Sequence, residues 1–166
     1  MSTGNGSGSL GPLEARLAEL GDATRRRSLE TVLARLRSEL TMDVDGILGT
    51  LAPGFELETR SAGAQRRVVG REALARMFRA MATDPSSSAW IDVERLVVDD
   101  DAVVLTGDVR MLLPATVADA LGYTSAGGGA SRSVTYAAVI VFELEHGLLT
   151  REVLYVDPAT TLVTDV

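Results

Sequence analysis

The chain lacks cysteine and lysine altogether and has a single histidine among its 166 residues. Without cysteine it has no disulfide, no thiolate nucleophile and no cysteine-ligated metal site. One histidine excludes a zinc site built from several imidazoles. No segment approaches the roughly 20 apolar residues of a membrane-spanning helix, and the Ser/Gly-rich beginning is unlike a secretory signal. We therefore expect a cytoplasmic protein that uses no metal or cofactor.

Positive charge is carried by arginine alone and is outnumbered, with 16 basic against 23 acidic residues and a net charge of -7. Binding of nucleic acid needs clustered cations, and the two dense runs, 25–27 and 66–67, are too short to line a groove. The expected partners are a small molecule and a second copy of the chain, not a nucleic acid or a membrane. The absence of lysine, with abundant Ala, Gly, Val and Leu, is typical of high-GC actinobacterial genes.

The length favours one domain behind a short tail. Residues 1–11 are rich in serine and glycine and are predicted to be disordered, because they cannot bury apolar surface. A single domain is expected over residues 12–166. It begins with an extra helix at about 12–21, and it carries a loop insertion at about 114–132 in which 115–121 has the composition for a helical turn.

Apolar periodicity predicts helices first and strands afterwards. Leucines and valines at helical spacing indicate a helix at about 23–40, and Asp43 and Asp45 are capping residues for a short helix that ends before Pro53. Another helix is expected at about 70–82. Alternation predicts strands at 55–60, 66–69, 90–98, 102–113 and 135–145, and in the closing run up to Pro158. This order is typical of an α+β domain with helices on one face of a curved sheet.

Two small features have ordinary structural explanations. His146 precedes Gly147 in a tight turn, where a hydrogen-bonding turn residue explains the histidine better than catalysis does. The glycines at 127–129 lack the adjoining strand and the lysine of a phosphate-binding loop. Neither feature enters the candidate site.

Four segments in order carry a family resemblance: MDVDGILGTLAP at 42–53, FELE at 55–58, VGREAL at 69–74, and the closing hairpin at 142–158. Through them the chain resembles the nuclear-transport-factor-2-like superfamily, in particular its SnoaL-like (polyketide-cyclase-like) branch. The resemblance covers about residues 28–158. It implies an α+β cone, in which a strongly bent antiparallel sheet wraps around about three helices and encloses a cavity.

Asp108 and Arg110 are the first candidate catalytic residues. They lie two apart on the strand predicted at 102–113, so their side chains share a face. A buried carboxylate beside an arginine has a lowered pKa and stays ionised, which suits orienting a water. The epoxide-hydrolase members of the superfamily keep an arginine and an aspartate at this spacing, in the opposite order. The alternative is a salt bridge on the solvent or dimer face.

Glu152 is another candidate catalytic residue and shares a strand face with Leu154 and Val156. An apolar cavity would raise its pKa and make it a general acid or base near neutral pH. The resemblance places the second acid of the epoxide-hydrolase branch at Leu154, which weakens the hydrolase interpretation. The alternative is an exposed strand glutamate.

Other strands contribute the remaining candidates. Trp90 and Asp92 share a face with Glu94, and the two carboxylates either divide acid and base roles in a cavity or are solvated. Tyr136 and Phe142 share a face on which core packing is the default, with Tyr136 also a hydrogen-bond donor. The candidates are, in full, catalytic Asp108, Arg110, Glu152 and Tyr136, and ligand-binding Trp90, Asp92, Phe142 and Leu154.

Two functions follow from the resemblance, since the fold implies a cavity and not one activity. Members of the superfamily cyclise polyketides, isomerise ketosteroids, hydrolyse epoxides or dehydrate their substrates. The first hypothesis is such an enzyme, acting without a cofactor on an apolar, oxygenated molecule of polyketide or terpenoid type. The second is a non-catalytic ligand-binding or dimeric accessory protein of the same fold.

Overall fold

The computed structural model describes residues 10–61, 64–84 and 87–166. They form five helices: α1 (Gly11–Glu19), α2 (Ala23–Leu40), α3 (Val44–Gly49), α4 (Arg71–Met81) and α5 (Ala115–Ala120). They also form seven strands: β1 (Leu51–Ser61), β2 (Ala64–Val69), β3 (Ser88–Val98), β4 (Ala102–Pro114), β5 (Ser131–Glu145), β6 (Leu148–Val156) and β7 (Leu162–Asp165). The tail predicted at 1–11 lies, up to residue 9, outside the described residues.

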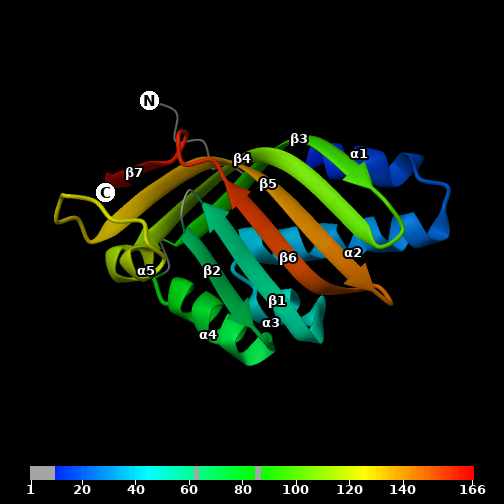
Figure 1. Cartoon of the computed structure of the whole chain (residues 1–166), viewed down its shortest axis with the longest axis horizontal. Coiled ribbons are helices and arrows are strands. Elements are labelled where there is room, and N and C mark those ends of the chain that lie inside the picture. The colour runs from blue at the N-terminus through cyan, green and yellow to red at the C-terminus, as the bar shows by residue number, and fades with distance from the viewer. Residues whose placement is uncertain (1–9, 62–63, 85–86) are drawn as a thin grey trace.

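All seven strands belong to one curled sheet (Figure 1). The order is β2-β1-β6-β5-β4-β3, and β7 pairs with β5 beside this path. Every pair is antiparallel except β1 with β6, which run parallel. The α+β cone is therefore confirmed. The one parallel pair was not predicted, because it joins two strands from distant parts of the chain and leaves no mark on either strand's own alternation.

The helices cover one face of this sheet, here called the inner face. The helix α2 packs on β3, β4 and β6, while α4 packs on β1 and β2. In the view of Figure 1, α2 passes behind the sheet, and α1 lies alongside β3 at one end of the molecule. Strand alternation sends Val103, Leu105 and Phe142 into the core between these layers, where each is fully buried. The opposite side of the sheet is the outer face.

Helix α2 is set by its cap and by an apolar stripe. The Asp22 carboxylate accepts hydrogen bonds from the backbone N–H groups of Thr24 and Arg25, which satisfies two of the free donors at the helix start. Asp43 caps α3 in the same way through Gly46, as predicted. The buried stripe of α2 also contains an arginine, Arg35, near the end of the helix at Leu40.

The turn between β5 and β6 confirms the structural explanation of the lone histidine. His146 has φ 54° and Gly147 has φ 79°, so both residues occupy the left-handed region that a two-residue hairpin of this type requires. The His146 side chain is 92% exposed. It therefore lies at the solvent end of a hairpin, not in a site.

The segment at 114–132 is more ordered than a loop insertion. It contains α5 at the predicted helical turn, and β5 begins at Ser131, four residues before the predicted start. The early start has a cause in the last strand, β7, which was not predicted and which pairs with β5 from Arg132 to Thr135. Among the described residues, no helix is long and apolar enough to cross a membrane.

Candidate active site

A cavity of about 560 Å³ opens between the inner face of the sheet, α2, α4 and the segment that follows α5. Its wall combines apolar side chains with polar and charged ones, among them Arg35, Glu39, Arg66 and Glu152. A smaller hollow of about 60 Å³ adjoins it and shares Glu39, Met111, Tyr136, Glu152 and Leu154 with it. The volume of the larger cavity lies within the range of small-molecule sites in proteins.

The polar centre of the cavity is an ion cluster made by Arg35, Glu39 and Glu152. Arg35 Nη1 donates to Glu39 Oε2 at 2.8 Å, and Arg35 Nη2 donates to Glu152 Oε2 at 3.2 Å. Arg35 and Glu39 are one helical turn apart on α2, whereas Glu152 faces them from β6 because its position alternates inward. The side chains of Arg35 and Glu152 are 1% and 8% exposed. One enclosed cation therefore serves two carboxylates, of which Glu152 is also enclosed and Glu39 is 26% exposed.

This arrangement sets the protonation of Glu152. Burial raises the pKa of Glu152 from 4.5 to about 7, because desolvation penalises the carboxylate. The positive charge of Arg35 acts against that rise, and the negative charge of Glu39 adds to it. A carboxyl group with such a pKa is present in both protonation states near neutrality, which is the property of a general acid or base.

Arg35 is held by more than its two carboxylates. Its guanidinium carbon lies 5.1 Å from the centroid of the Phe78 ring on α4, a cation–π distance. Arg35 Nε has no hydrogen-bond partner among the described residues. The guanidinium is thus fixed in position with one donor not used by the protein.

Tyr136 and Tyr123 form an aromatic pair in the wall of the same cavity. Their ring centroids are 5.9 Å apart and the ring planes are inclined by 13°. Burial, with the neighbouring Tyr123 and the two glutamates, raises the pKa of Tyr136 well above its ordinary value, so the hydroxyl stays protonated. Tyr136 is therefore a hydrogen-bond donor beside an acid/base group, with both residues lining the same cavity.

The structure brings some of the sequence candidates together. Glu152, Tyr136 and Leu154 line both the large cavity and the small hollow. Trp90 borders the small hollow from β3, although its pairing with Arg110 assigns it to the outer face of the strand. Phe142 is completely buried in the core and is not among the residues that line the large cavity.

The structure keeps Asp108, Arg110 and Asp92 apart from this group. They lie on the outer face, because they alternate with the buried inner-face residues Ile91 and Met111 of the same strands. Arg110 pairs with Asp92 on the neighbouring strand at 3.5 Å, with both side chains about half exposed. Asp108 lines a separate hollow of that face. The outer-face location is the alternative that the sequence left open, but the partner of Arg110 there is Asp92 and not Asp108.

Arg35, Glu39 and Tyr123 were not among the sequence candidates. A signal existed for Arg35, since it lies between Val32 and Leu36 on the apolar stripe that predicts α2, where a solvated arginine does not belong. Glu39 follows from Arg35 at i+4. Tyr123 gave no signal, because it lies in an irregular segment whose path depends on β5 and β7.

Comparison with known proteins gives the family and the fold. The profile of the SnoaL-like domain matches residues 30–152. No curated protein matches the chain. The chain is similar in structure to an LEH-like epoxide hydrolase of M. tuberculosis, with a TM-score of 0.61, 18% identity, and coverage of 81% of this chain and 85% of that one.

Two further solved structures have the same architecture. One, from Shewanella putrefaciens CN-32, is named for a SnoaL-like polyketide cyclase and gives a TM-score of 0.63 at 15% identity over 80% of this chain and 91% of that one. The other is TerC crystallised with polyporic acid, with a TM-score of 0.55, 19% identity, and coverage of 80% and 93%. At such identities these likenesses concern the fold, and the chemistry has to come from the cavity itself.

Proposed function

The chain belongs to the SnoaL-like family, and on that premise we propose that it is a cofactor-independent enzyme in which Glu152 moves a proton within the cavity. The reaction class is an isomerisation or cyclisation that begins with proton removal beside a carbonyl. One observation carries this proposal: a carboxyl group with a pKa of about 7 lies buried in an apolar cavity, in contact with a fixed arginine.

Each polar group has a role in this step. Ionised Glu152 removes the proton, the electron pair of the broken C–H bond forms a C=C bond, and the π pair of the carbonyl group moves to its oxygen. Tyr136, which stays protonated, donates a hydrogen bond to the negative charge that develops there. Arg35 orients Glu152 and keeps its ionised form accessible. Glu152 then returns the proton at another atom, so that no cofactor is consumed.

The expected substrate is an apolar, oxygenated molecule of polyketide or terpenoid type. The wall supplies apolar contacts from Leu57, Val68, Met77, Met111 and Leu154 for the body of the ligand, and polar side chains for its oxygen atoms. Structural neighbours named for a polyketide cyclase, an epoxide hydrolase and a ketosteroid isomerase support this class by analogy of fold. Hydrolysis is less favoured here, since Leu154 offers no second acid on β6.

A probe reaction tests the base without the natural substrate. Ring opening of 5-nitro-1,2-benzisoxazole needs only removal of one C–H proton, after which the N–O bond breaks and a coloured nitrophenolate is released. We expect the wild-type protein to accelerate it, with a rate that rises as Glu152 ionises through about pH 7. Glu152→Gln should lower kcat by about 10²- to 10⁴-fold, the usual contribution of a positioned base.

A matched control is Asp108→Asn, which removes a carboxylate on the outer face of the sheet and should leave the probe rate unchanged. If Glu152→Gln reacts as fast as the wild type while both bind the probe, Glu152 is not the base. The protein would then be the ligand-binding alternative.

An apolar row on the outer face of the sheet favours a homodimer. A homodimer agrees with the dimeric accessory protein of the second hypothesis and also with an enzyme. Val97, Val104 and Val141 stand side by side across β3, β4 and β5 on the outer face, and Val153 continues the row on β6 as a buried residue. Val97 is 67% exposed and Tyr155 nearby on the same face is 41% exposed. Such an apolar row supports a homodimer through the outer face. A monomeric mass in sedimentation equilibrium at micromolar concentration would contradict it.

A further inference from the structure

The cavity is lined by two arginines that differ in how their charge is compensated. Arg35 contacts the two carboxylates of Glu39 and Glu152. Arg66, on β2, makes one side-chain hydrogen bond, from Nη2 to the carbonyl oxygen of Ala120 at 2.7 Å. Among the residues that the structure describes, no carboxylate forms an ion pair with Arg66. Arg66 is thus a cation on the cavity wall that the protein does not neutralise.

The register of the sheet directs Arg66 into the cavity. Arg66 is paired with Thr59 of β1, and residues opposite each other on antiparallel strands share a face. Thr59 also lines the cavity, together with Leu57 and Val68, the pair next along the same face. The half-buried Arg66 therefore belongs to the inner face of the edge strand.

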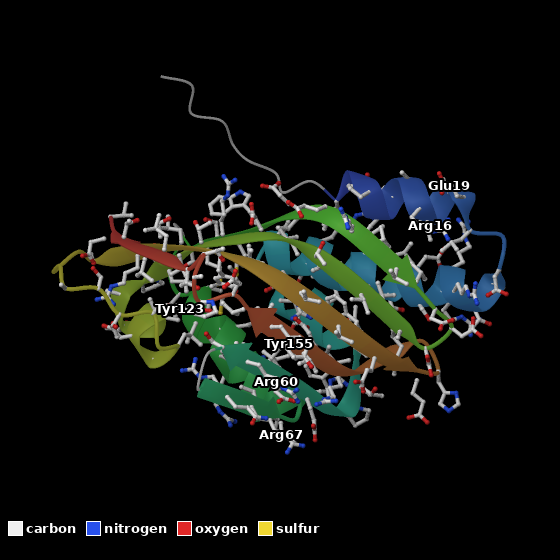
Figure 2. All side chains as sticks on the ribbon, turned by 45° about the horizontal axis from the view of Figure 1, so that its top comes forward. Arg16, Glu19, Arg60, Arg67, Tyr123 and Tyr155 are labelled. Atoms are coloured by element: carbon white, nitrogen blue, oxygen red, sulfur yellow. The ribbon has the colours of Figure 1, made fainter. Side chains whose placement is uncertain are left out.

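The guanidinium of Arg66 lies at the α5 end of the cavity. A Cβ built on Gly122 would approach Arg66 Nη2 to 3.8 Å, which places this group against the segment that follows α5. Tyr123 is the next residue, and Figure 2 shows it beside α5, well away from Arg60 and Tyr155 on the outer face. Burial raises the pKa of Tyr123, and the charge of Arg66 acts against that rise, as expected for neighbouring groups.

The charged groups of the wall do not balance when Glu152 is protonated. The wall then carries Arg35 and Arg66 against Glu39 alone, an excess of one positive charge. A guanidinium has five N–H donors, and the bond to Ala120 uses one of them. Planar guanidinium groups pair well with carboxylates and similar oxyanions.

We propose that the ligand of this cavity is an apolar molecule with one anionic oxygen group, a carboxylate or an acidic enol, which binds Arg66 at the α5 end. Its apolar body extends along Leu57, Val68 and Met77 towards Tyr136 and Glu152. This inference rests on the cavity of the proposed function and adds to it the charge and the orientation of the substrate. Arg66 is then the group that selects an acid over its neutral analogue.

The test compares 2-naphthoate with its methyl ester, two probes of nearly equal shape that differ in charge. Their binding is measured by titration calorimetry on the full chain, for the wild type, Arg66→Gln and Arg79→Gln. Arg79 is an exposed residue in the last turn of α4 and does not line the cavity, so it is the matched control. A charge-assisted hydrogen bond predicts that wild type and Arg79→Gln bind the acid about tenfold more tightly than the ester. In Arg66→Gln this preference should disappear.

The outcomes separate this inference from the proposed function. If the wild type binds the ester as tightly as the acid, the inference fails, and the Glu152 probe reaction is unaffected. If Arg66→Gln keeps the preference, another group recognises the anion and the inference also fails. A cavity that binds neither probe overturns it as well. The wild-type comparison needs no variant, so an absent preference overturns the inference even if Arg66→Gln, which loses its bond to Ala120, does not fold; in that case Arg66→Lys, which keeps the charge, is compared with Arg66→Met.

Discussion

Two buried glutamates on opposite faces of the same sheet have pKa values shifted in opposite directions. Glu152, on the inner face, has its pKa raised to about 7, and Glu58, on the outer face, has its pKa lowered to about 2. Both are enclosed, with side chains 8% and 4% exposed. Both are also bound by arginine. Neither burial nor the presence of a cation alone explains the difference.

The two carboxylates differ in the number of hydrogen-bond donors that each accepts from, and in how far the donating arginines remain exposed to water. Glu58 accepts hydrogen bonds from Arg60, Arg151 and Gln65, and these donors lower its pKa. Arg60 also lies over the ring of Tyr155, as Figure 2 shows, and remains 42% exposed. A cation in water loses little of its own hydration when it binds a carboxylate.

Glu152 has the reverse situation. Its single cation, Arg35, is itself almost completely enclosed and is shared with Glu39. The desolvation of Glu152 is therefore not fully offset, and the proton is retained up to about neutral pH. The ion pairs of the outer face stabilise the ionised form of Glu58, whereas the cluster of the inner face leaves Glu152 able to gain or lose a proton near neutral pH.

The largest effect is expected from removing the shared cation. Arg35→Met leaves Glu39 and Glu152 without a positive partner, and an uncompensated buried charge costs about 3–5 kcal/mol of unfolding free energy. The loss should be large at about pH 8, and smaller at about pH 5, where Glu152 is protonated in any case. Urea denaturation at both pH values measures it. Arg37→Met is the matched control, since Arg37 is an exposed α2 residue paired with Glu14 and should cost less than about 1 kcal/mol.

Glu152→Gln should change the pH dependence of stability. The folded state holds the Glu152 proton more tightly than the unfolded state, because its pKa is about 7 instead of 4.5. The stabilisation from this group is complete below about pH 4.5 and is lost as pH rises through 7, a change of up to about 3 kcal/mol. Denaturation midpoints from about pH 4 to 8 should show this decline in the wild type and not in Glu152→Gln. Glu145→Gln, at the exposed hairpin end, should keep the decline; if it too is flat, another group causes it.

Glu58→Gln should show the opposite sign, with a smaller effect than Arg35→Met. The folded-state pKa of Glu58 is depressed to about 2, so its stabilisation is present above pH 4.5 and is lost as pH falls through 2. The variant is therefore expected to be less stable than wild type at neutral pH and to converge with it in acid. Thermal melts at about pH 7 and pH 3 measure the two differences. Equal losses at both would mean that packing, and not charge, is what the substitution removes.

The smallest effect is expected for the exposed pair of the outer face. Arg110→Gln breaks a contact to Asp92 between half-exposed side chains, and such pairs contribute about 0–1 kcal/mol. Stability in urea should barely change, and the rate of the probe reaction should stay the same. A loss of turnover would return Arg110 to the catalytic candidates of the sequence and would contradict the separation of the two faces.

Much of the fold could be predicted from local patterns. The range of α2 follows from its apolar stripe, and the capping role of Asp43 and the turn at His146 follow from residue type. The shared strand face of Glu152 and Leu154 follows from alternation, and the packing of the helices makes it the inner face. These features depend on neighbours in the sequence, where periodicity is informative.

The site could be predicted only in part, because it is formed by contacts between distant segments. Alternation states that Asp108 and Arg110 share a face, but not which of the two faces carries the helices. That choice follows from the packing of α2 against β3, β4 and β6. The partner of Glu152 comes from α2, more than a hundred residues earlier in the chain. No local pattern relates these positions.

The sequence by itself determined the α+β order of elements, the absence of thiolate and multi-histidine chemistry, and the position of Glu152 on one strand face with Leu154 and Val156. Only the tertiary structure decided that this carboxyl group shares one buried arginine with Glu39, while Glu58 receives two partly hydrated ones. The reason is physical. The charge state of a buried group depends on how many donors and how much water surround it, and both depend on the packing of segments that are far apart in the chain.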